Sequence, residues 1–245
     1  MLDMRKRGIS VLAVIFLSIA GFSAISEART MSETQTLDAR QQGIVPIAAF
    51  TASGDIDRLT AALDEGLNNG LSINEIKEIL VQMYAYAGFP RSLNGLGAFM
   101  NVVEERRQKG IRDTIGQEAS PLPADSSSLD LGTEVQTKLV GAPVRGKLLE
   151  FAPAIDVYLK AHLFGDIFGR DNLDHQSREI ATIAALAAMN GVTSQLQSHF
   201  SMGMNAGLTE GQLKNLISVL GDKVGKTEAD RATEVLDSFL STRSR

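Results

Sequence analysis

Apolar residues recur at helical spacing in two stretches that lie in different halves of the chain. They occupy Ile76, Ile79, Leu80 and Met83 in the first stretch and Leu213, Leu216, Ile217 and Leu220 in the second. Spacings of three and four residues place such side chains on one face of an α-helix. Each stretch therefore predicts a helix that buries one face.

The same local signals precede both helices. Gly70 and Gly207 can adopt the left-handed backbone conformation that ends a helix. A hydroxyl residue follows each glycine, and Glu or Gln follows three residues later, as in a capping box. These pairs are Ser72 with Glu75 and Thr209 with Gln212. The pattern predicts that one helix ends at each glycine and that a capped helix begins after it.

A shift of 137 residues aligns the two halves without a gap, residues 58–105 on residues 195–242. Several identities coincide, including Gly66 with Gly203, Asn68 with Asn205, Leu71 with Leu208, Lys77 with Lys214 and Gly88 with Gly225. We interpret the two halves as an internal duplication, in preference to two helical hairpins that are alike by chance.

The second half contains a helical region that the first half lacks. Apolar residues recur at helical spacing over residues 131–149 and 152–168. Asp174 is a candidate N-cap for the next helix, in which residues 180–189 are apolar on nearly every face. Such a helix is expected at the centre of the core. Strand signals are weak throughout, and we therefore predict an all-α protein.

The remaining segments suggest how the chain is divided. Residues 1–28 combine a basic start, an apolar run and small residues, as in a secretory signal peptide. An uncleaved membrane anchor is the alternative. Cleavage would leave a periplasmic or secreted protein without stable membrane insertion. We expect a flexible segment over 29–45, a first and partial module over 46–109, a linker over 110–128 and a second, complete module over 129–242.

Composition excludes several classes of function. The chain of 245 residues has a net charge of −5 and no basic stripe, which argues against nucleic-acid binding. It has no cysteine, so neither disulfides nor thiol chemistry is available. The three histidines, His162, His175 and His199, lie apart without a cluster of carboxylates. We therefore predict that there is no metal site.

Five segments in a fixed order resemble those of a known family. They are NNGLSINEIKEILVQMYAYAGFP (68–90), FGDIFGR (164–170), SREIATIAALAAM (177–189), QLQSH (195–199) and NAGLTEGQLKNLI (205–217). This set resembles the carboxymuconolactone decarboxylase family, which shares its fold with alkylhydroperoxidase D-like proteins. The resemblance implies an alkylhydroperoxidase D-like helical bundle and a reaction without metal or organic cofactor on a lactone that bears carboxylates. It also implies assembly into rings.

Two branches of this family differ at the site, and the chain departs from both. The peroxidase branch has a Cys-x-x-Cys pair before its His, and the matching positions here are Val192 and Gln195. The decarboxylase branch has an acidic residue and Leu before its His, where this chain has Gln195 and Leu196. The first repeat has Ala62 in place of the histidine. We therefore expect one type of active site per chain.

His199 and Gln195 are the candidate catalytic residues. The unperturbed pKa of histidine lies near neutral pH, so its imidazole can deliver a proton to a carbon. Gln195 lies four residues earlier on the same helical face and can orient the ring or donate to a lactone oxygen. The alternative for His199 is a structural histidine bonded to a nearby carbonyl.

Arg178, Tyr86 and Arg91 are the candidate substrate-binding residues. A guanidinium can hold a carboxylate with two parallel hydrogen bonds. Arg178 lies near the start of the predicted central helix of the second half. Its alternative role is a structural ion pair with Asp166 or Glu179. Tyr86 and Arg91 reach the same pocket only if the first repeat packs on the second.

These observations lead to an exported, cofactor-free decarboxylase or lyase-type enzyme that acts on a small anionic lactone or keto acid. A non-catalytic binding or assembly protein on the same fold is the first alternative. An antioxidant peroxidase is the second, and the absence of cysteine disfavours it. Wide apolar helix faces predict a homo-oligomer, a trimer or a multiple of it.

Overall fold

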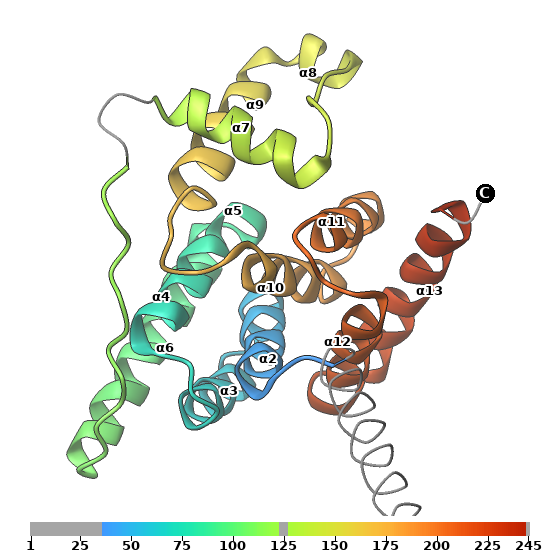
Figure 1. Cartoon of the computed structure of the whole chain (residues 1–245). Helices are drawn as coiled ribbons and strands as arrows, with labels where there is room; N and C mark the ends of the chain where they lie inside the picture. The colour runs from blue at the N-terminus through green and yellow to red at the C-terminus, as the bar shows by residue number, and fades with distance from the viewer. Residues whose placement is uncertain (1–35, 123–126, 244–245) are drawn as a thin grey trace, which may run out of the picture.

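The computed structural model describes residues 36–122 and 127–243. Every regular element of these residues is a helix, which confirms the predicted all-α class (Figure 1). No helix in this part of the chain is long and apolar enough to cross a membrane. The predicted signal peptide, residues 1–28, lies outside the described residues.

The helices fall into two repeats joined by a helical insertion. The first repeat contains α2 (Ala39–Ser53), α3 (Ile56–Asn68), α4 (Ile73–Gln82), α5 (Tyr84–Ala87) and α6 (Phe89–Gln108). The second contains α10 (His175–Ala187), α11 (Thr193–Asn205), α12 (Glu210–Lys223) and α13 (Lys226–Arg243). Between them lie α7 (Ser128–Val140), α8 (Lys147–Phe151), α9 (Pro153–Val157) and the π-helix η1 (Tyr158–Ile167).

The duplication includes one more helix pair than the sequence indicated. The shift of 137 residues places the first residue of α3 on that of α11, and likewise α4 on α12 and α6 on α13. In addition, α2 and α10 both begin after an aspartate N-cap, Asp38 and Asp174, which are 136 residues apart. One extra residue in the connection from α10 to α11 accounts for the difference. The two repeats therefore share four helices.

The predicted helix boundaries between the repeated helices are confirmed. The backbone N–H of Glu75 donates to Ser72, and the backbone N–H of Ser72 donates to Glu75, so both halves of the capping box form. Thr209 and Gln212 form the same reciprocal pair. Gly70 and Gly207, which precede these caps, have φ of +92° and +104°, a conformation that glycine adopts without steric cost.

The two aspartate-capped helices form the centre of the core. Residues 43–52 of α2 and residues 177–187 of α10 are all buried, and the two helices pack against each other. In Figure 1 they occupy the middle of the molecule, with α4 and α6 on one side and α12 and α13 on the other. The buried helix that residues 180–189 predicted is therefore present as α10.

Two expectations from the sequence are wrong in detail. Residues 39–45, expected to be flexible, form the start of α2, because Asp38 and Gln41 make a capping box and the next residues are buried. The helical spacing over residues 131–149 does not give one helix. Instead α7 ends at Gly141, whose φ is +84°, and the chain restarts in the short α8.

The segment expected to be a linker follows the first repeat closely where it is described. Residues 111–122 contain no helix, and α7 begins at Ser128. The backbone N–H groups of Ile73 and Asn74 donate to the carbonyls of Thr114 and Ile115, each at 2.9 Å. These bonds hold the segment against the start of α4.

Candidate active site

The imidazole of His199 is buried where α11 packs on α10. Only 6% of His199 is exposed. Gly203, one turn further along α11, allows the close approach of the two helices. A Cβ atom there would lie 3.4 Å from Ile183 Cδ1 and 3.8 Å from the Cβ of Glu179. The imidazole therefore faces the buried surface of α10.

Glu179 of α10 is the partner of this imidazole. Its Oε2 lies 2.7 Å from His199 Nδ1, and the residue is fully buried. Because a carboxylate accepts hydrogen bonds, we assign the Nδ1 proton to this bond, which leaves Nε2 to exchange a proton with a substrate. This pair joins two helices of the second repeat.

Tyr86 of α5 is the residue of the first repeat that contacts His199. Its ring meets the His199 ring edge-on, with ring centroids 5.6 Å apart. Burial raises the pKa of Tyr86, and the negative charge of Glu179 adds to the effect. The phenol therefore stays protonated and can act as a hydrogen-bond donor.

Two buried polar atoms beside His199 have no hydrogen-bond partner among the described residues, Tyr86 Oη and Glu179 Oε1. Thr182 lies next to the phenol; its Oγ1 donates to the carbonyl of Arg178 and accepts from Gln82 Nε2, which leaves one lone pair that can accept from Tyr86 Oη. An unsatisfied buried group costs about 1–3 kcal/mol, so most are paired in native structures. Both residues contact or adjoin the imidazole, so the phenol can serve as a donor and Glu179 Oε1 as an acceptor for a ligand bound beside His199.

Gln195 does not orient the imidazole, contrary to the role considered for it. Its side chain is exposed, and Oε1 accepts a hydrogen bond from Ser194 Oγ at 3.0 Å. The carboxylate that contacts the imidazole comes instead from α10, as Glu179. Sequence reasoning missed this role because it considered Glu179 only as a partner of Arg178.

Arg178 is fully buried and its charge is neutralised by the first repeat. Its Nη2 donates to Glu78 Oε1 at 2.8 Å and its Nη1 to Gln82 Oε1 at 3.1 Å. The remaining bonds go to the carbonyls of Leu173 and Arg170. The ion-pair partner is therefore Glu78, whereas Asp166 and Glu179 had been the candidates.

Arg91 contacts the end of α2. It is exposed, and its Nη1 donates to the carbonyl of Ala52. Of the five candidate residues, the structure brings together only His199 and Tyr86 in direct contact. Arg178 lies next to Glu179 in the sequence, but its guanidinium points into the contact with α4.

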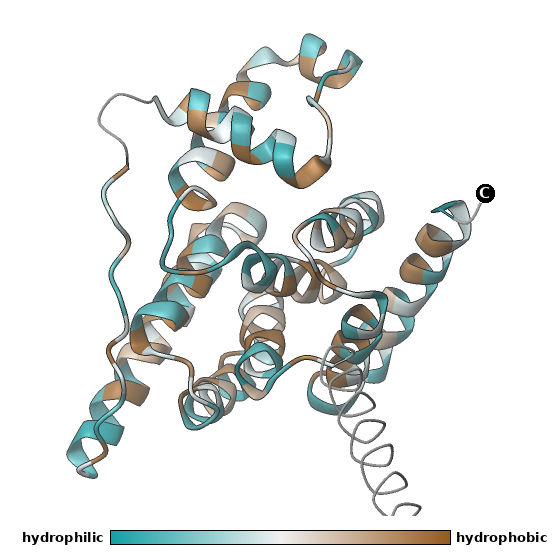
Figure 2. Ribbon diagram, in the orientation of Figure 1, coloured by the Kyte–Doolittle hydropathy of each residue, from teal (hydrophilic) through white to brown (hydrophobic). Residues whose placement is uncertain are grey.

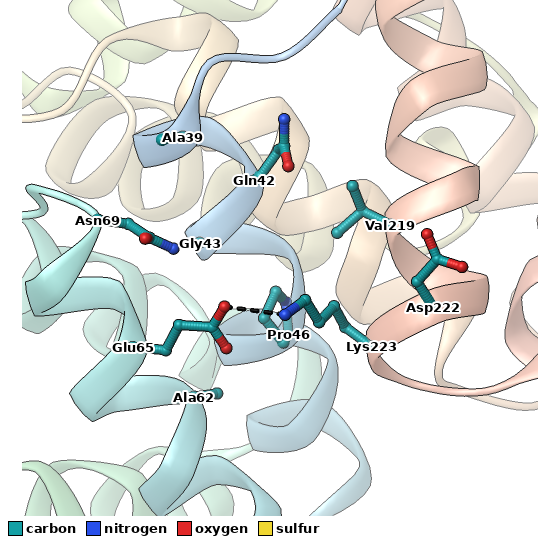
Figure 3. A pocket seen from close by; sticks show the side chains of 10 residues that line it. All are labelled: Ala39, Gln42, Gly43, Pro46, Ala62, Glu65, Asn69, Val219, Asp222 and Lys223. Carbon is teal, nitrogen blue, oxygen red and sulfur yellow. Dashed lines mark hydrogen bonds and ion pairs between the residues drawn. The ribbon is translucent and has the colours of Figure 1, made fainter.

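The surface of the described residues has three hollows that His199 does not line. One lies between α2, α3 and α12 and has a volume of about 250 Å³ (Figure 3). An ion pair between Glu65 and Lys223, 2.9 Å long, spans it. The described residues contain no cluster of three or more His, Cys, Asp or Glu side chains able to hold a metal ion. The buried Glu179–His199 pair is accordingly the best candidate for acid–base chemistry.

Known proteins match both repeats of this chain. The model of the carboxymuconolactone decarboxylase family matches residues 21–100 and 153–238, which contain parts of both repeats. The chain belongs to the carboxymuconolactone decarboxylase family. It is also similar to the 4-carboxymuconolactone decarboxylase of Acinetobacter baylyi, with 29% identity over 97 residues. This similarity covers 38% of the present chain and 72% of that protein.

Proposed function

We propose that this chain is a cofactor-free acid–base enzyme of the decarboxylase type, acting on a small unsaturated lactone or keto acid that bears a carboxylate. The observation that carries the proposal is the buried Glu179–His199 pair, with the unpartnered phenol of Tyr86 beside it. Membership of the family and the similarity to a 4-carboxymuconolactone decarboxylase support the same class of reaction.

The proposed reaction begins when the bond between the substrate carbon and its carboxylate breaks. The electron pair moves into the conjugated carbonyl, whose oxygen becomes negative, and CO₂ leaves. Tyr86 Oη donates a hydrogen bond to that oxygen. The imidazolium of His199 then donates its Nε2 proton to the carbon, which restores the carbonyl. His199 recovers a proton from water, so the net reaction consumes one proton and releases one CO₂.

Glu179 acts on this reaction through the imidazole. Its carboxylate fixes the ring by accepting the Nδ1 hydrogen bond, and its negative charge lies beside the ring that delivers the proton. An amide at this position keeps the hydrogen bond but loses the charge. Glu179→Gln therefore separates the electrostatic role of the carboxylate from its role in packing.

The two candidate arginines are occupied by protein acceptors, so the proposal does not use them to hold the reacting carboxylate. Arg178 is bound to Glu78 and Gln82, and Arg91 to Ala52. A carboxylate that enters a site already containing Glu179 is destabilised relative to neutral CO₂. We therefore expect a substrate with a single carboxylate to react faster than one with two.

Activity of His199 and Glu179 variants tests the proposal. Unsaturated lactones with one or two carboxylates are supplied, and CO₂ release is measured for the wild type and for His199→Ala and Glu179→Gln. We expect each variant to lose a factor of about 10² or more in kcat, the usual contribution of a positioned acid or base. His162→Ala is the matched control, because His162 forms a similar pair with Asp166 at 2.8 Å but is half exposed.

Retention of full activity in both variants would refute the catalytic assignment. If the wild type binds these acids in calorimetry but releases no CO₂ from any of them, the chain is a binding protein on the same fold. The burial of His199, which lines none of the three hollows, is the observation that favours this second candidate. Export after removal of residues 1–28 is part of the proposal, and the N-terminal sequence of the mature protein tests it.

A further inference from the structure

The duplication gives each residue of the candidate active site a counterpart in the other repeat. The helix pairs α2 with α10 and α3 with α11 fix the correspondence, because Gly66 and Gly203 meet equivalent neighbours. A Cβ on Gly66 would contact Ile47 and Leu71, and a Cβ on Gly203 would contact Ile183 and Leu208. The counterparts of Glu179, His199 and Tyr86 are then Gly43, Ala62 and Lys223.

These three counterparts come together in space and line the hollow between α2, α3 and α12 (Figure 3). Where one repeat carries a carboxylate and an imidazole, the other carries a hydrogen atom and a methyl group. The missing side chains leave space of about 250 Å³ in a position equivalent to the acid–base pair. The hollow therefore occupies the position in the first repeat that the Glu179–His199 pair occupies in the second.

The walls of this hollow carry both signs of charge. Lys223 of α12 and Glu65 of α3 face each other across it, and Asp222 lies beside Lys223 (Figure 3). The amides of Gln42 and Asn69 also line it. Pro46 adds an apolar surface and, because proline has no N–H, leaves the carbonyl of Gln42 without its intrahelical donor. Acceptors for a cationic group and a donor for an anionic group thus converge.

We propose that this hollow binds a small zwitterion of the α-amino acid class. The carboxylate of the ligand faces Lys223, and its ammonium group faces Glu65 and Asp222. Its short side chain packs on Pro46, Ala62 and Val219. A water molecule in the liquid occupies about 30 Å³, so the hollow has room for a ligand of up to about eight heavy atoms. Alanine and proline both lie within this size.

A ligand of one sign fits this site less well than a zwitterion. A simple carboxylate meets Glu65 and Asp222 as well as Lys223, and a simple amine meets Lys223. A zwitterion that enters between Glu65 and Lys223 exchanges their single ion pair for two pairs of opposite charge. Because of this charge arrangement, the affinity for alanine and proline should exceed the affinity for a simple anion.

Calorimetric titration of the full chain with L-alanine and L-proline tests the proposal, with propionate and propylamine as probes that each lack one charge. We expect both amino acids to bind at least about tenfold more tightly than either control. Ala62→Leu should abolish binding by filling the hollow, and Lys223→Met should weaken it about tenfold or more. Lys214→Met is the matched control, because this lysine of α12 pairs with Glu210 and lies outside the hollow.

Each other outcome overturns the proposal. Equal binding of propionate would make the hollow an anion site, and equal binding of propylamine would make it a cation site. Binding that survives both Ala62→Leu and Lys223→Met in folded protein would place the ligand elsewhere. An absence of binding at millimolar concentrations would leave the hollow as a structural remnant. None of these results depends on whether His199 is catalytic.

Discussion

The ion pair between Glu78 and Arg178 allows a quantitative test of how the two repeats are held together. Glu78 lies on α4 of the first repeat and is 2% exposed, and Arg178 lies on α10 of the second repeat and is 0% exposed. Glu78 also accepts hydrogen bonds from Arg170 and Asn172. Glu78→Met removes all of these acceptors at once and leaves the guanidinium of Arg178 buried without its ion-pair partner.

The expected cost follows from the burial of both partners. Removing one member of a buried pair costs about 3–5 kcal/mol, because the remaining charge has lost its solvent and its partner. Arg178→Met should cost less than Glu78→Met, because Glu78 keeps its bond to Arg170, which is partly exposed. Glu78→Met/Arg178→Met removes both charges and replaces them with apolar volume. We expect the double variant to lie within about 1–2 kcal/mol of the wild type.

Urea unfolding at fixed protein concentration measures these free energies of unfolding by linear extrapolation. The coupling energy of the double-mutant cycle should be at least about 2 kcal/mol. A loss of less than about 1 kcal/mol for Glu78→Met would show that Arg178 tolerates burial alone, supported by Gln82 and two carbonyls. Additive losses in the double variant would show that the two charges do not stabilise each other.

Two further changes probe the site and the predicted assembly. Tyr86→Phe removes a buried hydroxyl that has no partner, so stability in urea should stay equal or rise by about 1 kcal/mol while CO₂ release falls about 10²-fold; a loss of stability would show that the hydroxyl is paired. Phe151 of α8 is 88% exposed, and Leu148 of α8 and Ile155 of α9 are further exposed apolar residues; both helices contain hydrophobic segments of ribbon at the top of Figure 2. Phe151→Asp should therefore lower the mass of the expected homo-oligomer in light scattering, whereas an unchanged mass would place the interface elsewhere.

The sequence predicts well those parts of the fold that depend on local chemistry. Ser72 and Thr209 act as caps because the groups that satisfy them lie three residues away. The central position of α10 follows from its composition alone, since a helix that is apolar on nearly every face has no surface for water. The start of α2 was available from the same rules, in the spacing of Asp38 and Gln41 and the apolar residues after them. Its polar first turn concealed this signal.

The candidate site depends on contacts that no local rule supplies. His199 was identified by its residue type and by the family pattern, but its partner Glu179 lies 20 residues away on another helix. The partner of Arg178 lies 100 residues away in the other repeat. Both pairings require the packing angle and register of two helices, which the apolar pattern of each helix does not determine. The family pattern also predicted a role for position 195, where this chain has Gln in place of a carboxylate.

The duplication explains why a chain with two equivalent positions has one acid–base pair. A buried carboxylate and imidazole are costly to keep, because each must be removed from water and only partly recovers that cost in their mutual bond. Gly43 and Ala62 avoid this cost, and the remaining space is bordered by Glu65 and Lys223, which keep contact with solvent. At the retained copy, Glu179 and His199 fill the equivalent space, and two buried polar atoms stay unpaired. The first repeat shows that the fold forms without this costly pair, so the presence of the pair in the second repeat is better explained by a function than by stability.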